Sequence, residues 1–466
     1  ELKSCFKKRI TNNMSIKYIE KSEIPFLYNG MGDDFAMIEN PGYIFPHFEI
    51  VPLAKKLKNV DDITAVVMDM DGTTTTTEVL CIHSLEFMVR QITGRMSKQD
   101  WEGLNEKQDY PNIIGNSTTK HVEYLIKTYR DDINIEQLKR AFIKAAVRTI
   151  CFGKDPNRIA EVKNNLVSLG LNNLWEAAEI AAIAKKGSAV FESSSELQSL
   201  ITHNLNEFRI ETEHEVVRAA IDIYYARYHE ILAIIAEGKG AQIIKELNLP
   251  LGRHLIEPMP GALFLLLLLK GKLKGKIPTI KDYLIKNFEI LNDSSLDIES
   301  EMGFLQHLAA KFEHTPVKIA VVTSSIKYEA DIVLNQVFEV FREQLVETGL
   351  NPAEIADLSS LFTDHNQFYD AVITASDSSE IRLKPFRDLY SIALHKLSVP
   401  VEKFDQVIGF EDSESGNLAI RAAGIGMAIA VPFAQTAGHN LSAASYIANG
   451  GIPEVIFKKH LFLNHI

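Results

Sequence analysis

The chain has 466 residues, of which 46% are hydrophobic, and a formal net charge of −12. This length exceeds what one compact core holds, so we expect two or more domains. The negative charge argues against a nucleic-acid partner or an anionic membrane surface, although a divalent cation can still make a local site attractive to phosphate. Three widely separated cysteines, with no pair at metal-ligand spacing, favour a reducing cytoplasm: Cys5, Cys81 and Cys151.

The N-terminal residues 1–60 are predicted to form an extension of the main fold. No apolar core follows the basic residues near the N-terminus, so we expect no secretory signal. The longest apolar run of the chain, residues 262–269, is too short to span a bilayer and predicts a buried helix. We therefore expect no membrane partner.

A strand is predicted at residues 63–69, where an apolar, β-branched run leads into Asp69. Residues 78–256 then have helical periodicity almost throughout, and strand patterns return at 317–323, 371–374, 405–410 and 425–431. Short strands separated by helical stretches are typical of a parallel sheet with crossover connections. We predict an α/β core from residues 61–77 and 257–466, split by an all-helical domain at 78–256 and carrying a polar, irregular insert near 271–300.

Polar side chains follow four of the predicted strands. Asp69 and Asp71 are two residues apart at the end of the first strand, so their side chains point to the same side. In open parallel sheets ligands bind beyond the carboxyl ends of the strands. Several carboxylates at one such edge make a site for Mg²⁺, and a hydroxyl with a lysine can bind phosphate oxygens. The other strand-end residues are Thr323, Ser324, Lys384, Glu411 and Asp412.

These residues form four short motifs in chain order: Asp69-Met-Asp71-Gly-Thr, Thr323-Ser324, Lys384-Pro385 and Glu411-Asp412. In these motifs the chain resembles the phosphohydrolases of the haloacid dehalogenase (HAD) superfamily. Glu78 stands where the β-phosphoglucomutase-like branch often has a glutamate, and the helical insert matches the position of that branch's cap domain. The resemblance implies a Rossmann-like, HAD-like core. It covers residues 60–77 and 257–432, is weak over the insert and is absent from the first 59 residues.

The resemblance also implies a role for each motif residue. Asp69 would be the nucleophile that forms an aspartyl-phosphate, and Asp71 the general acid and then the general base. Thr323, with Ser324, would hold a phosphate oxygen, and Lys384 would neutralise the phosphate and Asp69. Mg²⁺ would be held by Asp69, the main-chain carbonyl of Asp71, and Asp412, with support from Glu411.

The cap is less informative than the core. Residues 114–121 resemble the cap loop that faces the active site in this branch, and this loop could bring Ser117, Thr118, Lys120 or His121 to the substrate. A capped helix start with a solvated lysine and histidine is an equally good interpretation. A group of residues on one helical pattern, Tyr224, Tyr225, Tyr228 and His229, is expected to be core or interface rather than ligand contacts.

The sequence therefore predicts an Mg²⁺-dependent phosphatase that hydrolyses a small phosphorylated metabolite. Three alternatives stay open. A phosphomutase would use the same Asp69 and Asp71, although Cys81 stands near a histidine of such enzymes and Thr118 where they have a cap arginine. A non-catalytic binding protein could retain the site, and a phosphonate-cleaving enzyme would need a lysine in the cap. Neither the identity of the substrate nor the oligomeric state can be read from the sequence.

Overall fold

The computed structural model describes residues 20–40, 45–114, 117–247, 254–377, 382–433, 436 and 438–464. The chain divides into two compact units, residues 1–55 and residues 56–466. In the first unit a short 3₁₀ helix and the helix α2 precede two antiparallel strands that the sequence did not predict: η1 (Lys21–Glu23), α2 (Ile24–Met31), β1 (Asp34–Glu39) and β2 (Phe48–Leu53).

The second unit is built on a parallel sheet of six strands in the order β5-β4-β3-β6-β7-β8. The strands are β3 (Ala65–Asp69), β4 (Lys318–Val322), β5 (Ala371–Ile373), β6 (Val407–Glu411), β7 (Met427–Ala430) and β8 (Tyr446–Ile447). This confirms the predicted α/β fold class and five of the strands. The sixth, β8, has only two residues and gives too short a pattern to be recognised in the sequence.

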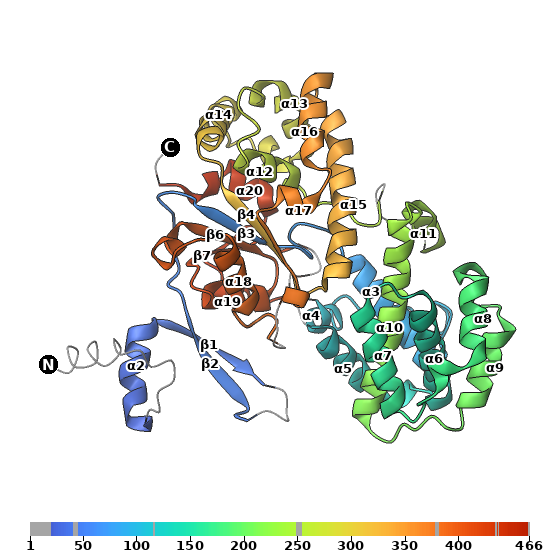
Figure 1. The fold of residues 1–466 in the computed structure, drawn as a ribbon. Helices are drawn as coiled ribbons and strands as arrows, with labels where there is room; N and C mark the ends of the chain where they lie inside the picture. The colour runs from blue at the N-terminus through green and yellow to red at the C-terminus, as the bar shows by residue number, and fades with distance from the viewer. Residues whose placement is uncertain are drawn as a thin grey trace. The chain divides into compact units, whose positions relative to one another are not determined.

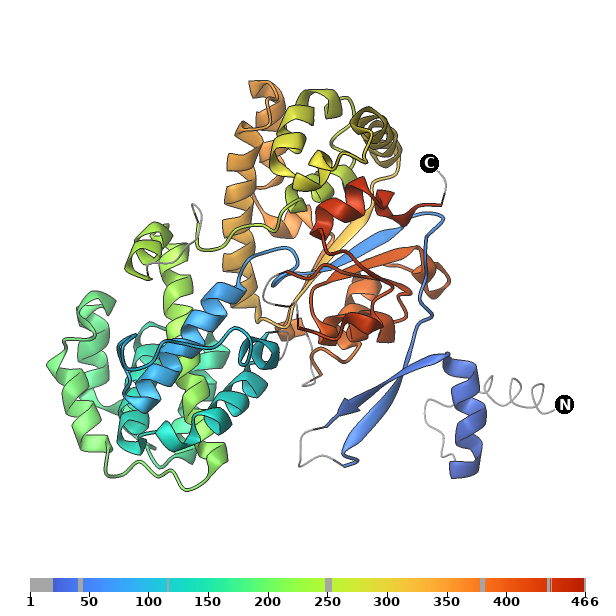
Figure 2. The same ribbon diagram turned by 180° about the vertical axis from the view of Figure 1, so that it is seen from behind.

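Alternate residues of the central strand β3 face opposite layers of helices. Ala65 and Val67 pack in one cluster with α18 (Asp388–Lys396) and α19 (Glu414–Ala422). Val66 and Met68 belong to the larger cluster on the other face, with α12 (Ala262–Leu269), α15 (Lys327–Val346) and α20 (Gly451–Phe457). Figures 1 and 2 show these two layers from opposite sides. Because both faces of β3 are buried, its sequence is a continuous apolar run rather than an alternating one.

The insert after β3 is helical, as predicted, and no strand occurs in the described part of 78–256. Its two ends lie together, because Thr76 exchanges hydrogen bonds with the Glu257 backbone. Its helices are α3 (Glu78–Thr93), α4 (Tyr110–Ile113), α5 (Thr118–Thr128), α6 (Ile135–Phe152), α7 (Pro156–Ser168), α8 (Ala178–Lys186), α9 (Ser195–Asn204), α10 (Glu213–Ala236) and α11 (Gly240–Leu247), with the 3₁₀ turns η2 (Arg130–Asp132), η3 (Leu174–Glu176) and η4 (Ser188–Val190).

The prediction of an irregular insert near 271–300 was wrong. This segment contains α13 (Ile277–Asn287), η5 (Glu289–Asn292) and the start of α14 (Ile298–His314). Ile277, Ile280 and Leu284 recur at helical spacing and are buried, so α13 is an amphipathic helix whose polar face dominates its composition.

The apolar run at 262–269 is the helix α12, and all eight of its residues are buried. Among the described residues, no helix combines the length and the apolar character that crossing a membrane requires. The remaining elements of this unit are α16 (Pro352–Leu361), α17 (His365–Phe368), η6 (Ala375–Asp377), η7 (Val401–Gln406), η9 (Leu441–Ala443) and η10 (His460–Phe462).

Candidate active site

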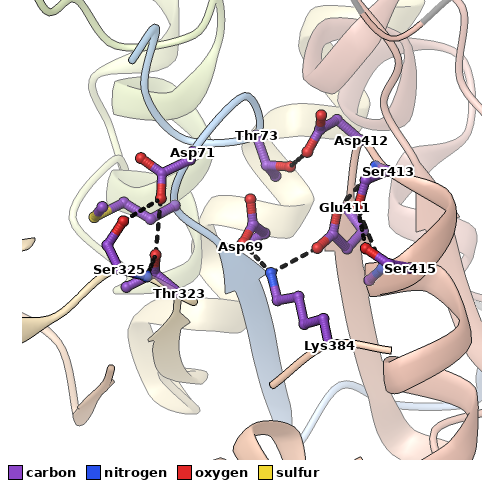
Figure 3. Close-up of polar contacts among 12 residues, drawn as sticks. Asp69, Asp71, Thr73, Thr323, Ser325, Lys384, Glu411, Asp412, Ser413 and Ser415 are labelled. Atoms are coloured by element: carbon purple, nitrogen blue, oxygen red, sulfur yellow. Dashed lines mark hydrogen bonds and ion pairs between the residues drawn. The ribbon is translucent and has the colours of Figure 1, made fainter. Parts of the chain in front are cut away.

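The carboxyl ends of three neighbouring strands bring the predicted motifs together. Asp69 ends β3 and is in register with Val322 at the end of β4, which leads into Thr323. On the other side Met68 pairs with Phe410, so Glu411 at the end of β6 lies beside Asp69. Figure 3 shows these side chains converging from three strands and the loops that follow them. The convergence follows from the common direction of the strands.

Lys384 is the positive centre of this group. Its ammonium forms ion pairs with Asp69 and, at 2.7 Å, with Oε1 of Glu411, and its side chain is only 9% exposed. Burial acts against the charged lysine, but the two carboxylates outweigh it and raise the pKa of Lys384 well above its usual value. For Glu411, burial acts to raise the pKa, but Lys384 and the donors of Ser413 outweigh it and lower the pKa. Lys384 therefore stays charged at the centre of the site.

Three buried carboxylates are arranged to hold a cation. Ligand atoms of Asp69, Glu411 and Asp412 lie within 4.8 Å of one another, and no other group of this kind occurs among the described residues. Both oxygens of Glu411 already accept hydrogen bonds, from Lys384 and from Ser413, whereas Asp412 accepts one from Thr73 at 3.1 Å. Asp69 and Asp412 are thus the better placed to ligate, with Glu411 in support.

The electrostatics of these carboxylates favour the binding of a cation. Burial, followed by the charge of Glu411, raises the pKa of both Asp69 and Asp412 well above the ordinary value. Hard oxygen donors of this kind suit Mg²⁺. The residues present therefore fit the predicted magnesium ion.

Asp71 is held apart from this cluster by three hydroxyl groups. It accepts hydrogen bonds from Thr77 at 2.5 Å, Thr323 at 2.8 Å and Ser325 at 3.2 Å. Burial raises the pKa of Asp71, although the donors Thr77 and Thr323 act in the opposite direction. A carboxyl group with a raised pKa and a fixed orientation is suited to general acid and base chemistry.

Thr323 occupies a different position from the one that the resemblance implies. It is fully buried, and its hydroxyl donates to Asp71 instead of facing the cavity. Its neighbours Ser324 and Ser325 line the cavity. Thr323 therefore orients Asp71, and Ser324 is the better placed to contact a phosphate oxygen.

Two glycines allow the carboxylates to approach one another. Gly72 has φ +81°, and a Cβ there would lie 2.6 Å from Oε1 of Glu78 and 2.8 Å from Oδ2 of Asp412. A Cβ at Gly416, in the first turn of α19, would lie 1.7 Å from Oε1 of Glu411. Both motifs therefore need glycine for a close approach that a side chain would block.

A cavity of about 270 Å³ lies over the strand ends, between the sheet and the inserted helices. Asp69, Asp71, Lys384 and Asp412 line it from the core. From the insert it is lined by Glu78, Cys81, Ile82, Ile113, Ile114, Ser117, Thr118, Thr119, His121, Tyr224, Tyr225 and Tyr228. A second cavity of about 230 Å³ lies beside α12 and α13 and contains none of the motif residues.

Of the residues in the insert that were predicted to reach the substrate, some line the cavity and others do not. Ser117, the residue before α5, lines the cavity, whereas Lys120 in the first turn of α5 is exposed and does not line it. Tyr224 and Tyr228 lie in the hydrophobic core, as expected, and Tyr225 is half-buried against it, but all three also line the cavity. Their helical spacing was visible, but a pattern cannot tell a face packed on a helix from one packed on a cavity. Burial raises the pKa of Cys81 to about 12, so this residue is an unreactive thiol in the wall.

Comparison with known proteins gives similarity to solved structures alone. No protein-family model and no curated protein matches the chain. The similar structures include CbbY from Rhodobacter sphaeroides in complex with phosphate, at 14% identity over 83% of this chain and 94% of that one, with a TM-score of 0.34. A β-phosphoglucomutase from Clostridium difficile is 13% identical over 86% and 97% of the two chains, with a TM-score of 0.31. A hydrolase from Pseudomonas syringae is 12% identical over 86% and 99%, with a TM-score of 0.34.

At these identities and TM-scores the comparisons assign no activity to this chain. The chain resembles the HAD phosphohydrolases through its four motifs, whose residues meet at one edge of the sheet.

Proposed function

We propose that this protein is an Mg²⁺-dependent phosphatase that hydrolyses a small phosphate monoester through an aspartyl-phosphate. The observation that carries the proposal is the separation of two kinds of carboxylate at one sheet edge. Asp69 lies with Asp412 and Glu411 beside Lys384, whereas Asp71 is turned to three hydroxyl groups. One aspartate is thus placed for attack and the other for proton transfer.

In the first step a carboxylate oxygen of Asp69 attacks phosphorus, and the bond from phosphorus to the ester oxygen breaks. The departing oxygen carries away the bonding electron pair and takes a proton from Asp71. In the second step Asp71 takes a proton from water, whose oxygen displaces the Asp69 carboxylate from phosphorus and releases inorganic phosphate. Thr77, Thr323 and Ser325 hold Asp71 in one orientation for both proton transfers.

The charges at the site support phosphoryl transfer. Lys384 neutralises Asp69 and stands where it can also compensate phosphate oxygens. A bound Mg²⁺ would supply further positive charge between the phosphate and the carboxylates of Asp69 and Asp412. We propose that residues 78–256 act as the cap, since their side chains line the cavity opposite the sheet.

A phosphomutase is less well supported than a phosphatase. Such an enzyme must hold a second phosphate on the far side of its substrate, and that group requires positive charge. Among the described residues, no lysine or arginine of the insert lines the cavity.

A reducing compartment such as the cytoplasm is our proposed location, and Cys81 and Cys151, both free thiols, are compatible with it.

The proposal is tested by release of inorganic phosphate from p-nitrophenyl phosphate and a set of metabolite phosphates. We expect turnover with Mg²⁺ and its loss in excess EDTA. Asp69→Asn should lower the rate by at least about 10³-fold, because an amide is a poor nucleophile. Turnover that persists in Asp69→Asn or in EDTA would contradict the mechanism.

Asp71→Asn separates the two steps, because p-nitrophenolate leaves without a proton. We expect this variant to release p-nitrophenol once per enzyme molecule and then stop, since no base activates water. A steady rate equal to that of the wild type would remove Asp71 from the mechanism.

A further inference from the structure

The far wall of the active-site cavity is formed by three tyrosines of α10. Thr212 caps this helix, because its hydroxyl accepts a hydrogen bond from the backbone N–H of Glu215. The rings of Tyr224 and Tyr228 are stacked, with centroids 5.7 Å apart and planes at 11°, and Tyr225 meets Tyr224 at 5.1 Å. This wall of the cavity is therefore aromatic.

The hydroxyl groups of these tyrosines differ in their contacts. Tyr224 donates to the Cys81 sulfur at 3.4 Å, and Tyr225 donates to the Thr118 hydroxyl at 3.2 Å. Tyr228 is 6% exposed, and its hydroxyl has no hydrogen bond to any residue that the structure describes. Burial, then Glu329 and Asp71, raises the pKa of Tyr228 well above its usual value, so this hydroxyl stays protonated near two acids. This hydroxyl is therefore available to a ligand in the cavity.

The same part of the cavity is short of positive charge. Glu329 lines it, and its charge is among the causes that raise the pKa of Tyr225 and Tyr228. Glu78 also lines the cavity, but it lies at the metal end, because a Cβ on Gly72 would approach both Glu78 and Asp412. Lys384 is already paired with Asp69 and Glu411. Near the tyrosines the described lining residues therefore include a glutamate but no lysine or arginine.

Two basic groups lie close to this wall without lining the cavity. Arg158 lies over the Tyr225 ring at 4.4 Å, but it forms ion pairs with Asp222 and Glu161 and does not line the cavity. Oε1 of Glu329 is 2.7 Å from Nε2 of His229, and His229 does not line the cavity either. Arg158 is thus engaged behind the wall, whereas His229 contacts one oxygen of Glu329 itself and would share this carboxylate with a ligand.

We propose that the leaving group of the substrate carries an ammonium, so that the substrate class is the phosphate monoesters of small amino alcohols. This inference rests on the proposed phosphatase activity. An ammonium is attracted to tyrosine rings and to carboxylates, and it would lie between α10 and Glu329. A carboxylate or second phosphate at the same place would be repelled by Glu329. The cavity of about 270 Å³ admits a molecule of this size.

Three substrates of similar length test the charge of the leaving group. They are phosphoethanolamine, ethyl phosphate and phosphoglycolate, whose leaving groups are cationic, neutral and anionic. With Mg²⁺ at neutral pH we expect kcat/KM to fall in that order, by about tenfold at each step. A neutral or anionic substrate that is turned over as well as phosphoethanolamine would overturn the inference.

A pair of variants locates the effect. Glu329→Gln should lower the ratio of kcat/KM for phosphoethanolamine over ethyl phosphate by about three- to tenfold. Glu123→Gln, the same change at an exposed glutamate of α5 outside the cavity, should leave the ratio unchanged. An unchanged ratio in Glu329→Gln would overturn the assignment of Glu329. If that variant does not fold, the order of the three substrates in the wild type decides.

p-Nitrophenyl phosphate distinguishes failure of this inference from failure of the proposed function. If it is hydrolysed while phosphoethanolamine is not preferred, the enzyme is a phosphatase and the amino-alcohol class is wrong. If no phosphate is released from any of the four esters, the phosphatase activity itself is contradicted.

Discussion

The positive charge of Lys384 compensates two buried carboxylates of the site. Its ammonium pairs with Asp69 and Glu411, and all three side chains are less than 10% exposed. Removing one partner of a buried ion pair leaves the other charge uncompensated, at a cost of about 3–5 kcal/mol. We expect Lys384→Met to lose that much unfolding free energy in urea denaturation with EDTA, and to lose phosphatase activity.

Lys396→Met is the matched control for this substitution. Lys396 pairs with Asp377 at 2.7 Å but is 45% exposed, and such surface pairs contribute under about 1 kcal/mol. Equal losses in the two lysine variants would mean that the ion pairs of Lys384 are not the source of its effect.

His83 on α3 gives the cap a pH-dependent stability. Burial, followed by Arg227 and Arg90, lowers the pKa of His83 to about 4, and its Nε2 has no partner among the described residues. Because the unfolded chain has the higher pKa, it takes up the proton first as the pH falls. The contribution of neutral His83 to the free energy of unfolding is complete above about pH 6.5 and is lost as the pH falls toward 4. It amounts to at most about 3 kcal/mol.

The test compares urea denaturation of the wild type and His83→Gln at several values between pH 7 and pH 4. The variant should lose less unfolding free energy across this window, because glutamine does not titrate. His203→Gln, at an exposed histidine of α9, serves as the control and should keep the slope of the wild type. Parallel curves for wild type and His83→Gln would show that His83 is not the group responsible.

At the scale of elements, the first turn of α19 is fixed by its approach to Glu411. Alanine normally favours a helix over glycine by about 1 kcal/mol. A Cβ at Gly416, however, would lie 1.7 Å from Oε1 of Glu411, an atom already held by Lys384. We expect Gly416→Ala to destabilise the protein by about 1–3 kcal/mol and to weaken the apparent affinity for Mg²⁺ in the phosphatase assay.

At Gly303 in α14 we expect the same glycine-to-alanine substitution to have the opposite effect on stability. A Cβ there meets no atom within 4 Å, so Gly303→Ala should stabilise by about 0.5–1 kcal/mol. If Gly416→Ala were equally stabilising, Glu411 would have moved aside without cost, and the interpretation of this turn would be wrong.

The elements that could be predicted from the sequence are those with a local signal. The strand ends at Asp69, Thr323 and Glu411 follow apolar runs, and the parallel direction of the strands then brings them to one edge. By contrast, α13 has a polar composition and becomes a helix through burial of one face. The direction of the Thr323 hydroxyl and the exposure of Lys120 depend on tertiary contacts, and a motif carries no information about them.

At the scale of the whole molecule, every residue that lines the active-site cavity lies in the unit formed by residues 56–466. We therefore expect a fragment that starts at Lys56 to keep kcat/KM for p-nitrophenyl phosphate within about twofold of the full chain. Loss of activity in a fragment whose circular dichroism remains native would assign residues 1–55 a part in turnover.

The position of β3 at the middle of the sheet has a consequence for synthesis of the chain. β3 ends at Asp69, but the strands on either side of it begin at Lys318 and Val407. On the ribosome the helices of the insert are therefore synthesised before either neighbouring strand, β4 or β6. During this time the apolar strand β3 has no strand to pair with. Pairing over such sequence distances is slow and exposes the edge to aggregation, so β3 is the segment that a chaperone would need to shield.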